Sequence, residues 1–499
     1  MKKLLSVIIT LAIVFCAFGA SLVVEAATPK TYYVSNSGSD SNSGTSPESP
    51  FKTIDKVNHL SLGAGDRVLF ERGSIWRNET LYCKSGNSTA VVYYGDYGTG
   101  AKPAFYGSNK NYAREDYWAL YDAEKKAYRS TFTISGDIGA IVINEGQLVY
   151  YYHYSATKWQ DIYSRLFWID SSGYIYLKTS LGNPGAVFDD IELIQTACLI
   201  NGDGADYVTI ENIELKYGNY GYKSTENQMY VTLRGLDISY IGGRTGDEAR
   251  GGNGIEFYAA NVNNILVDSC NITQCYDTAF TCQMNRVNTD FFDITVRNCD
   301  FSYCHWTVEV WFNQGGGSGQ GAIRRINFNN NRFAYAGYGF GSGGDSMPNN
   351  NPTNSNVVRW YDEETGSSTF VQNFLFEDCT VYDVNFNYNI FCNSRDYLFY
   401  SSYDMDFTGN TFIAGESTKI GRLGATTDKS LLTAENIKAI DSAATFKKTA
   451  KITNTAKNAD LFSYNVINDG DFEKAYGKEY LVNGDFSDGK TAWQSYGAN

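Results

Sequence analysis

From residue 207 onward the chain repeats one short pattern of apolar and polar positions. Each copy reads apolar, polar, small or Asn, inward-facing residue, polar, apolar, and the copies recur every 23 to 48 residues. Seven copies share this frame: 210–215, 233–238, 267–272, 296–301, 328–333, 376–381 and 407–412. A repeat too short to bury its own apolar face stacks on its neighbours. The pattern therefore predicts an all-β chain that forms a right-handed parallel β-helix, with one coil per copy.

The fourth position of the repeat predicts a ladder of side chains inside the helix. It reads Ile213, Leu236, Cys270, Cys299, Asn331, Cys379 and Asn410. A second inward column reads Gly218, Ile241, Cys275, Cys304, Ala336 and Val384. Buried amides satisfy each other from rung to rung, and thiols at the same positions pack as small apolar groups. Most of the cysteines are thus predicted to be packing thiols rather than disulfides or zinc ligands.

Outside the repeat, the pattern divides the chain into further regions. Short β-rich runs predict that residues 27–109 form an N-terminal cap and the first coils. Strands without a common register predict a sandwich-like β domain at 110–195, inserted before the helix proper, 196–415. Residues 416–480 read as a C-terminal cap or linker, and 481–499 resemble the start of a truncated carbohydrate-binding module.

Residues 1–26 have the features of a secretory signal. Lys2 and Lys3 precede the apolar run 4–23, and small residues stand before the expected cleavage site after Ala26. We therefore expect a secreted, extracellular protein with no membrane association after cleavage. The formal net charge of -14 argues against a nucleic-acid partner, since phosphate binding requires basic stripes. A monomer is expected.

The stretch 254–311 contains the candidate working surface. If 254–258, 277–282 and 306–311 are successive parallel strands, Ile255, Ala279 and Val308 point inward, and Glu256, Phe280 and Glu309 point outward. Asp277 then lies where the middle strand begins. Insertions beside these strands would wall the surface into a cleft.

This arrangement predicts the chemistry of glycosidic-bond hydrolysis, which uses two carboxyl groups. Glu309 is expected to be the general acid and Asp277 the nucleophile or base, with Glu256 able to replace either. Aromatic side chains would stack on sugar rings, or else pack under the loops. The residues expected to contact substrate are Tyr258, Phe280, Trp306, Trp311, His305, Lys223 and Arg250.

Several alternatives stay open at this point. Outward carboxylates on strands can be solvated charges. Lys223 aligns with Glu256 one rung earlier, where it would be the base of a polysaccharide lyase or a salt-bridge partner. Arg250 would meet a carboxylated sugar or pair with neighbouring acids. No cofactor or metal is expected: calcium was considered for Asp40, Asp66 and Asp96, but no ligand spacing supports it.

Three stretches carry a resemblance to secreted bacterial proteins of the pectate-lyase-like superfamily: 32–73, 174–184 and 253–279. Within that group the chain looks most like β-helix glycoside hydrolases with an inserted β-sandwich. The resemblance implies a glycoside hydrolase acting on plant cell-wall or related polysaccharide, with Asp277 and Glu309 as its acidic pair. A pectate-type lyase and a non-catalytic carbohydrate-binding β-helix are the two other functions considered.

Overall fold

The computed structural model describes most of the chain between residues 28 and 448. The described residues are 28–136, 138–146, 148–151, 167–195, 198–245, 249–258, 261–284, 290–312, 321–337, 339–340, 358–360, 379–394, 397–401, 406–414, 419–423, 431–432 and 434–448. The predicted secretory signal and the predicted module at 481–499 lie outside these residues.

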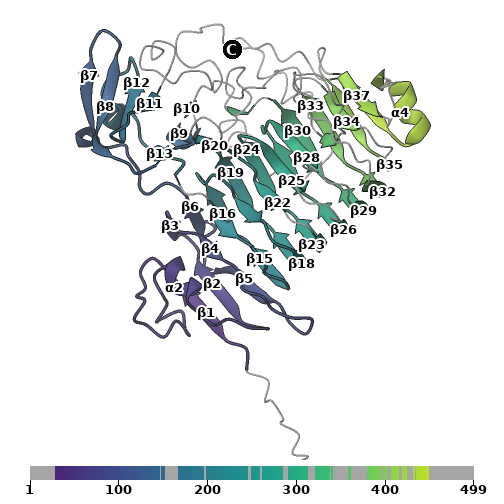
Figure 1. The fold of residues 1–499 in the computed structure, drawn as a ribbon, viewed down its shortest axis with the longest axis horizontal. Coiled ribbons are helices and arrows are strands. Elements are labelled where there is room, and N and C mark those ends of the chain that lie inside the picture. Colours follow the sequence, from purple (N-terminus) through teal and green to yellow (C-terminus); the bar gives the residue numbers. More distant parts are fainter. Residues whose placement is uncertain are drawn as a thin grey trace, which may run out of the picture.

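Three long sheets, called A, B and C here, wrap around one elongated core (Figure 1). Sheet A contains β1 (Thr31–Val34), β2 (Arg67–Glu71), β5 (Val92–Tyr97), β15 (Val208–Glu211), β18 (Gln228–Arg234), β23 (Asn261–Asp268), β26 (Asp290–Arg297), β29 (Gly321–Asn329), β32 (Cys379–Asn387) and β35 (Asp406–Thr408). Sheet B contains β3 (Ile75–Arg77), β6 (Ala104–Tyr106), β16 (Glu214–Lys216), β19 (Asp237–Ile241), β24 (Asn271–Cys275), β27 (Asp300–Ser302), β30 (Arg332–Ala336), β33 (Ile390–Ser394), β36 (Thr411–Ala414) and β39 (Thr445–Lys448).

Sheet C carries the candidate site. It contains β4 (Leu81–Tyr82), β14 (Ile200–Asn201), β17 (Tyr222–Ser224), β22 (Ile255–Tyr258), β25 (Thr278–Met284), β28 (Trp306–Phe312), β31 (Val358–Trp360), β34 (Tyr397–Ser401), β37 (Lys419–Leu423) and β38 (Leu431–Leu432). All pairings in the three sheets are parallel except that between β37 and β38. Successive strands enter A, B and C in turn, so the predicted parallel β-helix is confirmed.

From β15 onward, a left-handed residue turns each described coil from sheet A to sheet B. The turning residues have φ between 55° and 65° and are Asn212, Gly235, Ser269, Asn298, Asn330, Tyr388 and Gly409. Gly and Asn reach this conformation at low cost. The small-or-Asn position of the repeat is therefore the corner of the coil.

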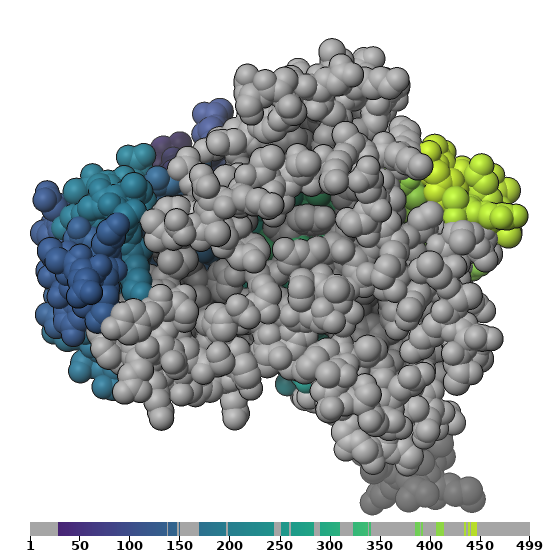
Figure 2. Space-filling model, turned by 90° about the horizontal axis from the view of Figure 1, so that it is seen from above, coloured from purple at the N-terminus to yellow at the C-terminus, as the bar shows by residue number. Residues whose placement is uncertain are grey.

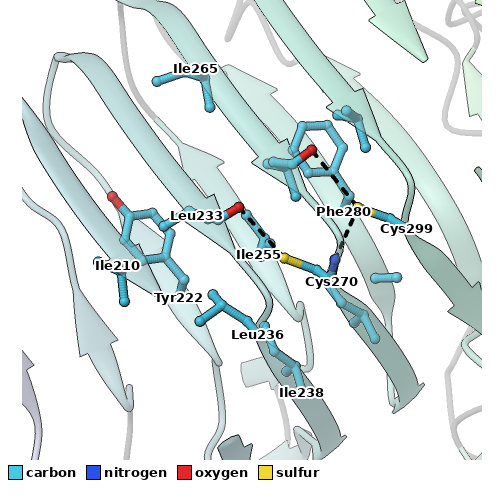
Figure 3. Close-up of a cluster of buried hydrophobic side chains, with 14 of the residues drawn as sticks. Ile210, Tyr222, Leu233, Leu236, Ile238, Ile255, Ile265, Cys270, Phe280 and Cys299 are labelled. Atoms are coloured by element: carbon cyan, nitrogen blue, oxygen red, sulfur yellow. Dashed lines mark hydrogen bonds between the residues drawn. The ribbon is translucent and has the colours of Figure 1, made fainter. Parts of the chain in front are cut away.

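The internal ladder follows directly after this corner (Figure 3). The Cys270 backbone N–H donates to the Cys299 sulfur at 3.4 Å, and the Cys299 N–H donates to Asn331 Oδ1 at 2.9 Å. From there amides continue the chain, since Asn331 N–H donates to Asn389 Oδ1 and Asn389 N–H donates to Asn410 Oδ1, each at 2.9 Å. The eight cysteines whose side chains the structure describes are buried free thiols: Cys83, Cys198, Cys270, Cys275, Cys282, Cys299, Cys304 and Cys392.

Two predicted ladder positions are wrong. Asn389, not Cys379, stands between Asn331 and Asn410, because Phe386 of β32 pairs with Phe328. In the second column Ser394, not Val384, pairs with Ala336. The true copy is therefore 386–391, in which a tyrosine, Tyr388, occupies the left-handed corner.

Residues between β6 and β14 form antiparallel strands set apart from the three long sheets. They are β7 (Trp118–Asp122), β8 (Ala127–Thr133), β9 (Ala140–Ile143), β10 (Leu148–Tyr151), β11 (Phe167–Ile169), β12 (Tyr174–Lys178) and β13 (Ile191–Leu193). They enclose a hydrophobic cluster of their own, which includes Trp118, Ile141 and Leu177. Figure 2 shows these blue strands at one end of the molecule and the yellow-green α4 (Ala434–Ile440) at the other.

One face of β9 packs against the corner that precedes sheet C. Val142 lies in a cluster with Tyr217, Tyr240 and Tyr276 of successive coils. The same region is fastened by a two-pronged ion pair in which Arg77 donates to both oxygens of Glu192, at 2.9 and 2.8 Å. These antiparallel strands thus flank the candidate site. The two remaining helices are short, α2 (Ile54–Asn58) and α3 (Pro184–Val187).

Candidate active site

Glu256 and Glu309 occupy one outward column of sheet C. Lys223 pairs with Glu256, Glu256 with Thr281, and Thr281 with Glu309. The two glutamates are therefore two rungs apart, or about 10 Å along the sheet at about 4.8 Å per rung. The alignment of Lys223, Glu256 and Glu309 expected from the repeat is present in the strand register.

The strand between the two glutamates is shifted by one residue from the prediction. Phe280 pairs with Ile255 and Val308, so it points inward and is only 1% exposed. The expected role of Phe280 as an outward sugar platform is wrong. A one-residue shift exchanges the two faces of a strand, and Thr281 takes the outward place. Its hydroxyl is buried and has no hydrogen-bond partner among the described residues.

Glu256 is held by a cation and an amide. Its Oε1 lies 2.9 Å from Lys223 Nζ, and its Oε2 accepts a hydrogen bond from Asn253 Nδ2. Although burial alone would lower the pKa of Lys223, the negative charge of Glu256 raises it above its usual value. Lys223 therefore faces Glu256 as an ammonium group.

Glu309 receives hydrogen bonds from side chains of β25. Its Oε2 accepts from Thr278 Oγ1 at 3.3 Å and from Gln283 Nε2 at 3.5 Å. These donors lie on either side of Thr281 along the strand and lean the carboxyl group toward the rung of Glu256. On the next rung of the same column, Glu309 pairs with Arg359 of β31.

A short relay of hydrogen bonds joins the two glutamates. Asn253 donates to Glu256 through its Nδ2, while its Oδ1 accepts from the Thr278 backbone N–H at 3.1 Å. Thr278 in turn donates its hydroxyl to Glu309. Movement of either carboxyl group is thereby coupled to the other through residues that are themselves buried.

Asp277 lies directly before β25, at the edge of the same cluster. Its backbone N–H donates to the Gly252 carbonyl, and its own carbonyl accepts from the Trp306 N–H, both at 3.1 Å. Gly252 has φ of +144°, and a Cβ there would lie 2.7 Å from the Asp277 nitrogen. Only glycine fits this position without a shift of the Asp277 backbone.

Tyr220 lies within the electrostatic reach of two of the carboxylates. The Lys223 ammonium sits 3.8 Å from the centre of its ring. Burial raises the pKa of the Tyr220 hydroxyl to about 12, with Glu256 adding to the rise, Lys223 opposing it and Asp277 adding a smaller part. This tyrosine stays neutral in the usual pH range and is one of the residues that the sequence analysis missed.

The other expected contact residues are placed as follows. Tyr258 is half-buried and pairs with Gln283, which pairs with Trp311, so these residues flank the glutamate column. His305 and Trp306 are buried, with their ring centres 4.0 Å apart. Arg250 lies on β21 (Ala249–Gly251), which pairs with β20 (Gly243–Thr245) before β22. The side chains of Trp311 and Arg250 lie outside the described residues.

The three carboxylates of the acidic cluster are buried, and no metal cage was found in the described part of the chain. Glu256 and Glu309 are each 3% exposed, and Asp277 is 7% exposed. A search of the described residues found no group of three or more His, Cys, Asp or Glu placed to hold an ion. Asp40 and Asp66 instead accept backbone N–H groups in turns. The same residues contain no helix long and apolar enough to cross a membrane.

Comparison with known proteins finds carbohydrate-active relatives. No protein-family profile matches the chain. A stretch of 136 residues is 34% identical to a lacto-N-biosidase of Bifidobacterium longum subsp. longum. The matched stretch covers 25% of this chain and 8% of that enzyme. This chain thus spans a small fraction of the length of its curated relative.

Similar solved structures include enzymes that are named as hydrolases of glycans. A lacto-N-biosidase of glycoside hydrolase family 136 from Eubacterium ramulus is 13% identical over 85% of this chain and 68% of its own, with a TM-score of 0.34. A protein named glycoside hydrolase is 9% identical over 86% and 98%, with a TM-score of 0.43. An exopolygalacturonase from Thermotoga maritima is 10% identical over 79% and 86%, with a TM-score of 0.32.

Proposed function

We propose that the protein is a glycoside hydrolase and that Glu256 and Glu309 are its acid–base pair. The observation that carries this proposal is their register: both point outward from sheet C, two rungs apart, in one buried polar cluster. Rigid parallel strands fix the distance between two such groups better than loops do. The name of the curated relative, a lacto-N-biosidase, agrees with this class.

We assign different roles to the two glutamates. Glu309 stays the general acid expected from sequence; it accepts hydrogen bonds from Thr278 and Gln283 of β25, and Arg359 of β31 is its neighbour on the next rung. Glu256 replaces Asp277 as the favoured base, because it shares the outward column of Glu309, two rungs away.

The reaction follows from these roles. Glu256 removes a proton from a water molecule, whose oxygen forms a bond to the anomeric carbon. The bond from that carbon to the glycosidic oxygen breaks, and Glu309 donates its proton to the departing oxygen. A backbone spacing of about 10 Å leaves room for the water and suits inversion, for which the carboxyl groups stand roughly 6.5–9.5 Å apart. The unpaired hydroxyl of Thr281, between them, can hold the water.

The same geometry gives less support to the alternative that the protein is a polysaccharide lyase. A lyase needs a base that accepts a proton at working pH. Lys223 is ion-paired at 2.9 Å and its pKa is raised, so its ammonium is a poor base. The salt-bridge alternative for Lys223 fits the structure, and Lys223 then acts by holding the Glu256 side chain in place.

The substrate we propose is an oligosaccharide or polysaccharide of plant cell-wall or related origin. Export by the predicted signal, a monomeric state, and catalysis without a cofactor or calcium all stay predictions. The acidic composition continues to argue against nucleic acid as a partner.

The test is product analysis over a panel of xylans, pectins, fucosylated glycans and a lacto-N-biose-terminated oligosaccharide, the last chosen for the name of the curated relative. Reducing ends and ultraviolet absorbance are read together for the wild type, Glu309→Gln and Lys223→Met. Sugar release without absorbance, abolished by Glu309→Gln, supports the proposal. Absorbing unsaturated products that depend on Lys223 would instead establish a lyase, and binding without any product would leave a carbohydrate-binding protein.

A further inference from the structure

The outward column of sheet C continues beyond the candidate site toward the N-terminal end of the helix. Tyr82 of β4 pairs with Asn201 of β14, and Asn201 pairs with Lys223 of β17. Their neighbours Leu81, Ile200 and Tyr222 are fully buried, so Tyr82, Asn201 and Lys223 share the outward face with Glu256. We call the column from Tyr82 to Glu309 the outward strip.

Exposure falls steadily along the outward strip. The Tyr82 residue is 51% exposed, Asn201 is half-buried, and the Lys223 side chain is 24% exposed. Glu256 is 3% exposed and Thr281 is fully buried. Within this part of the strip, the cluster of carboxylates therefore opens to solvent in the direction of Tyr82.

Tyr82 has the properties of a sugar-stacking platform. An aromatic ring that is half exposed on a rigid strand offers an apolar face at little cost in conformational entropy. The strand is anchored at this residue, because the Tyr82 backbone N–H donates to Asn58 Oδ1 at 2.9 Å. Three rungs separate Tyr82 from Glu256, or about 14 Å, which is farther than one sugar ring can reach.

We propose that Tyr82 is a remote subsite that stacks on a pyranose ring of the glycan, several rings away from the cleaved bond. The glycan then lies along sheet C, over Asn201 and Lys223, with its reacting bond at Glu256 and Glu309. This inference rests on the proposed function, and it makes Tyr82 a determinant of preference for longer chains rather than a catalytic residue.

The experiment compares a long and a short substrate. The long one is a glycan from which the wild type releases sugar, and the short one is a nitrophenyl glycoside of the same terminal sugar. Tyr82→Ala is expected to raise KM for the long substrate by about 3- to 10-fold, the worth of one stacking contact. Its kcat on the long substrate and both constants on the short one stay unchanged, and Tyr82→Phe behaves like the wild type.

The matched control is Tyr388→Ala. Tyr388 is 61% exposed but lies at the corner between sheets A and B, away from the outward strip. An equal loss in this variant, an equal loss on the short substrate, or no loss on the long one would overturn the subsite.

Failure of the proposed function is separable from failure of this inference. If the wild type hydrolyses nothing, xylan, pectin and a lacto-N-biose-terminated oligosaccharide serve as binding probes in affinity electrophoresis. Retardation that Tyr82→Ala weakens and Tyr388→Ala does not would support the subsite in a non-catalytic protein. Equal retardation of the wild type and Tyr82→Ala, or no retardation by any probe, would overturn the subsite.

Discussion

The outward strip of sheet C and the internal ladder at the corner of sheets A and B are both columns of polar side chains stacked on coil rungs. In the ladder each group is satisfied by the next rung: Asn389 accepts from Asn331 and donates to the Phe328 carbonyl at 2.8 Å. In the strip a cation, two carboxyl groups and an unpaired hydroxyl stand side by side. The same scaffold thus gives stability where polar groups are complete and, under the proposed function, reactivity where they are not.

The largest expected effect is loss of catalysis from the strip. Glu256→Gln and Glu309→Gln are each expected to lower kcat by about 10²–10⁴-fold, because each removes a proton-transfer group. The melting temperature of Glu309→Gln should stay close to that of the wild type, since glutamine keeps the shape of the side chain. Glu256→Gln is expected to be less stable, because it leaves the Lys223 ammonium without its counter-charge. Initial rates of sugar release and thermal unfolding measure the two quantities.

Glu214→Gln is the matched control for these variants. Glu214 on β16 also pairs with a lysine, Lys216 at 2.7 Å, and accepts from a tyrosine, Tyr106 at 2.9 Å, but it belongs to sheet B. Unchanged kcat is expected. An equal loss in this control would mean that any ion-paired glutamate of the scaffold has the same effect.

The ladder should respond in the opposite way. Asn389→Leu leaves buried groups of Asn331 and Phe328 without partners, and we expect it to lower the free energy of unfolding by about 2–4 kcal/mol. At a temperature where the variant is folded, its kcat should match the wild type. Urea denaturation measures the free energy of unfolding. The control is Asn387→Ala, which removes one half-buried amide contact to Asn329 and is expected to lower that free energy by less than about 1 kcal/mol.

Asp268 is a carboxylate outside the outward strip, and its hydrogen bonds contribute to the stability of the fold. Although burial acts to raise it, hydrogen bonds from Arg297, Asn298 and Ser269 lower the pKa of Asp268 to about 2. A lowered folded-state pKa contributes stability above the unfolded value of about 4, and this stability is lost as pH falls toward 2. Asp268→Asn is therefore expected to cost roughly 1–2 kcal/mol at pH 7.

The pH dependence supplies the check on Asp268. The difference in unfolding free energy between wild type and Asp268→Asn should shrink steadily between pH 4 and pH 2. A difference that is constant over this range would show that the loss comes from packing rather than from the ionised carboxylate. Activity at neutral pH should be unaffected.

The smallest expected effect concerns the relay between the two glutamates. Thr278→Val removes the hydroxyl that donates to Glu309 at 3.3 Å. Loss of this hydrogen bond is expected to raise the activation free energy by about 1 kcal/mol, which lowers kcat roughly 5-fold. Thr278→Ser keeps the donor and should restore the rate. An unchanged KM would mark Thr278 as a positioning residue, whereas equal losses in both variants would point to packing alone.

The repeat pattern predicted most of the helix because each of its positions has one physical role. Where the corner residue is small or Asn, as at Asn298 and Asn330, the predicted frame agrees with the strand pairing. It fails at the coil whose corner is Tyr388, since an aromatic residue with positive φ is uncommon and the pattern selected 376–381 instead. At this coil, contacts with the neighbouring coils outweigh the local preference of tyrosine for negative φ, and the local sequence pattern does not reveal such contacts.

The sequence predicted the positions of the charged residues of the candidate site better than those of its neutral hydrogen-bonding residues. Glu256, Glu309 and Lys223 stand at equivalent repeat positions, so their alignment followed from the frame. Asn253, Thr278 and Gln283 act through hydrogen bonds that depend on a one-residue shift in β25. Asn253 carried one signal, its place immediately before the working strand, but nothing in the sequence fixed its direction.

The most direct test of the account is the configuration of the first sugar that the wild type releases, followed by proton nuclear magnetic resonance before mutarotation. If Glu256 and Glu309, two rungs apart, act on a water molecule, the first product has the inverted anomeric configuration. A first product with retained configuration would require a closer pair of carboxyl groups and would contradict the assignment of Glu256 as the base.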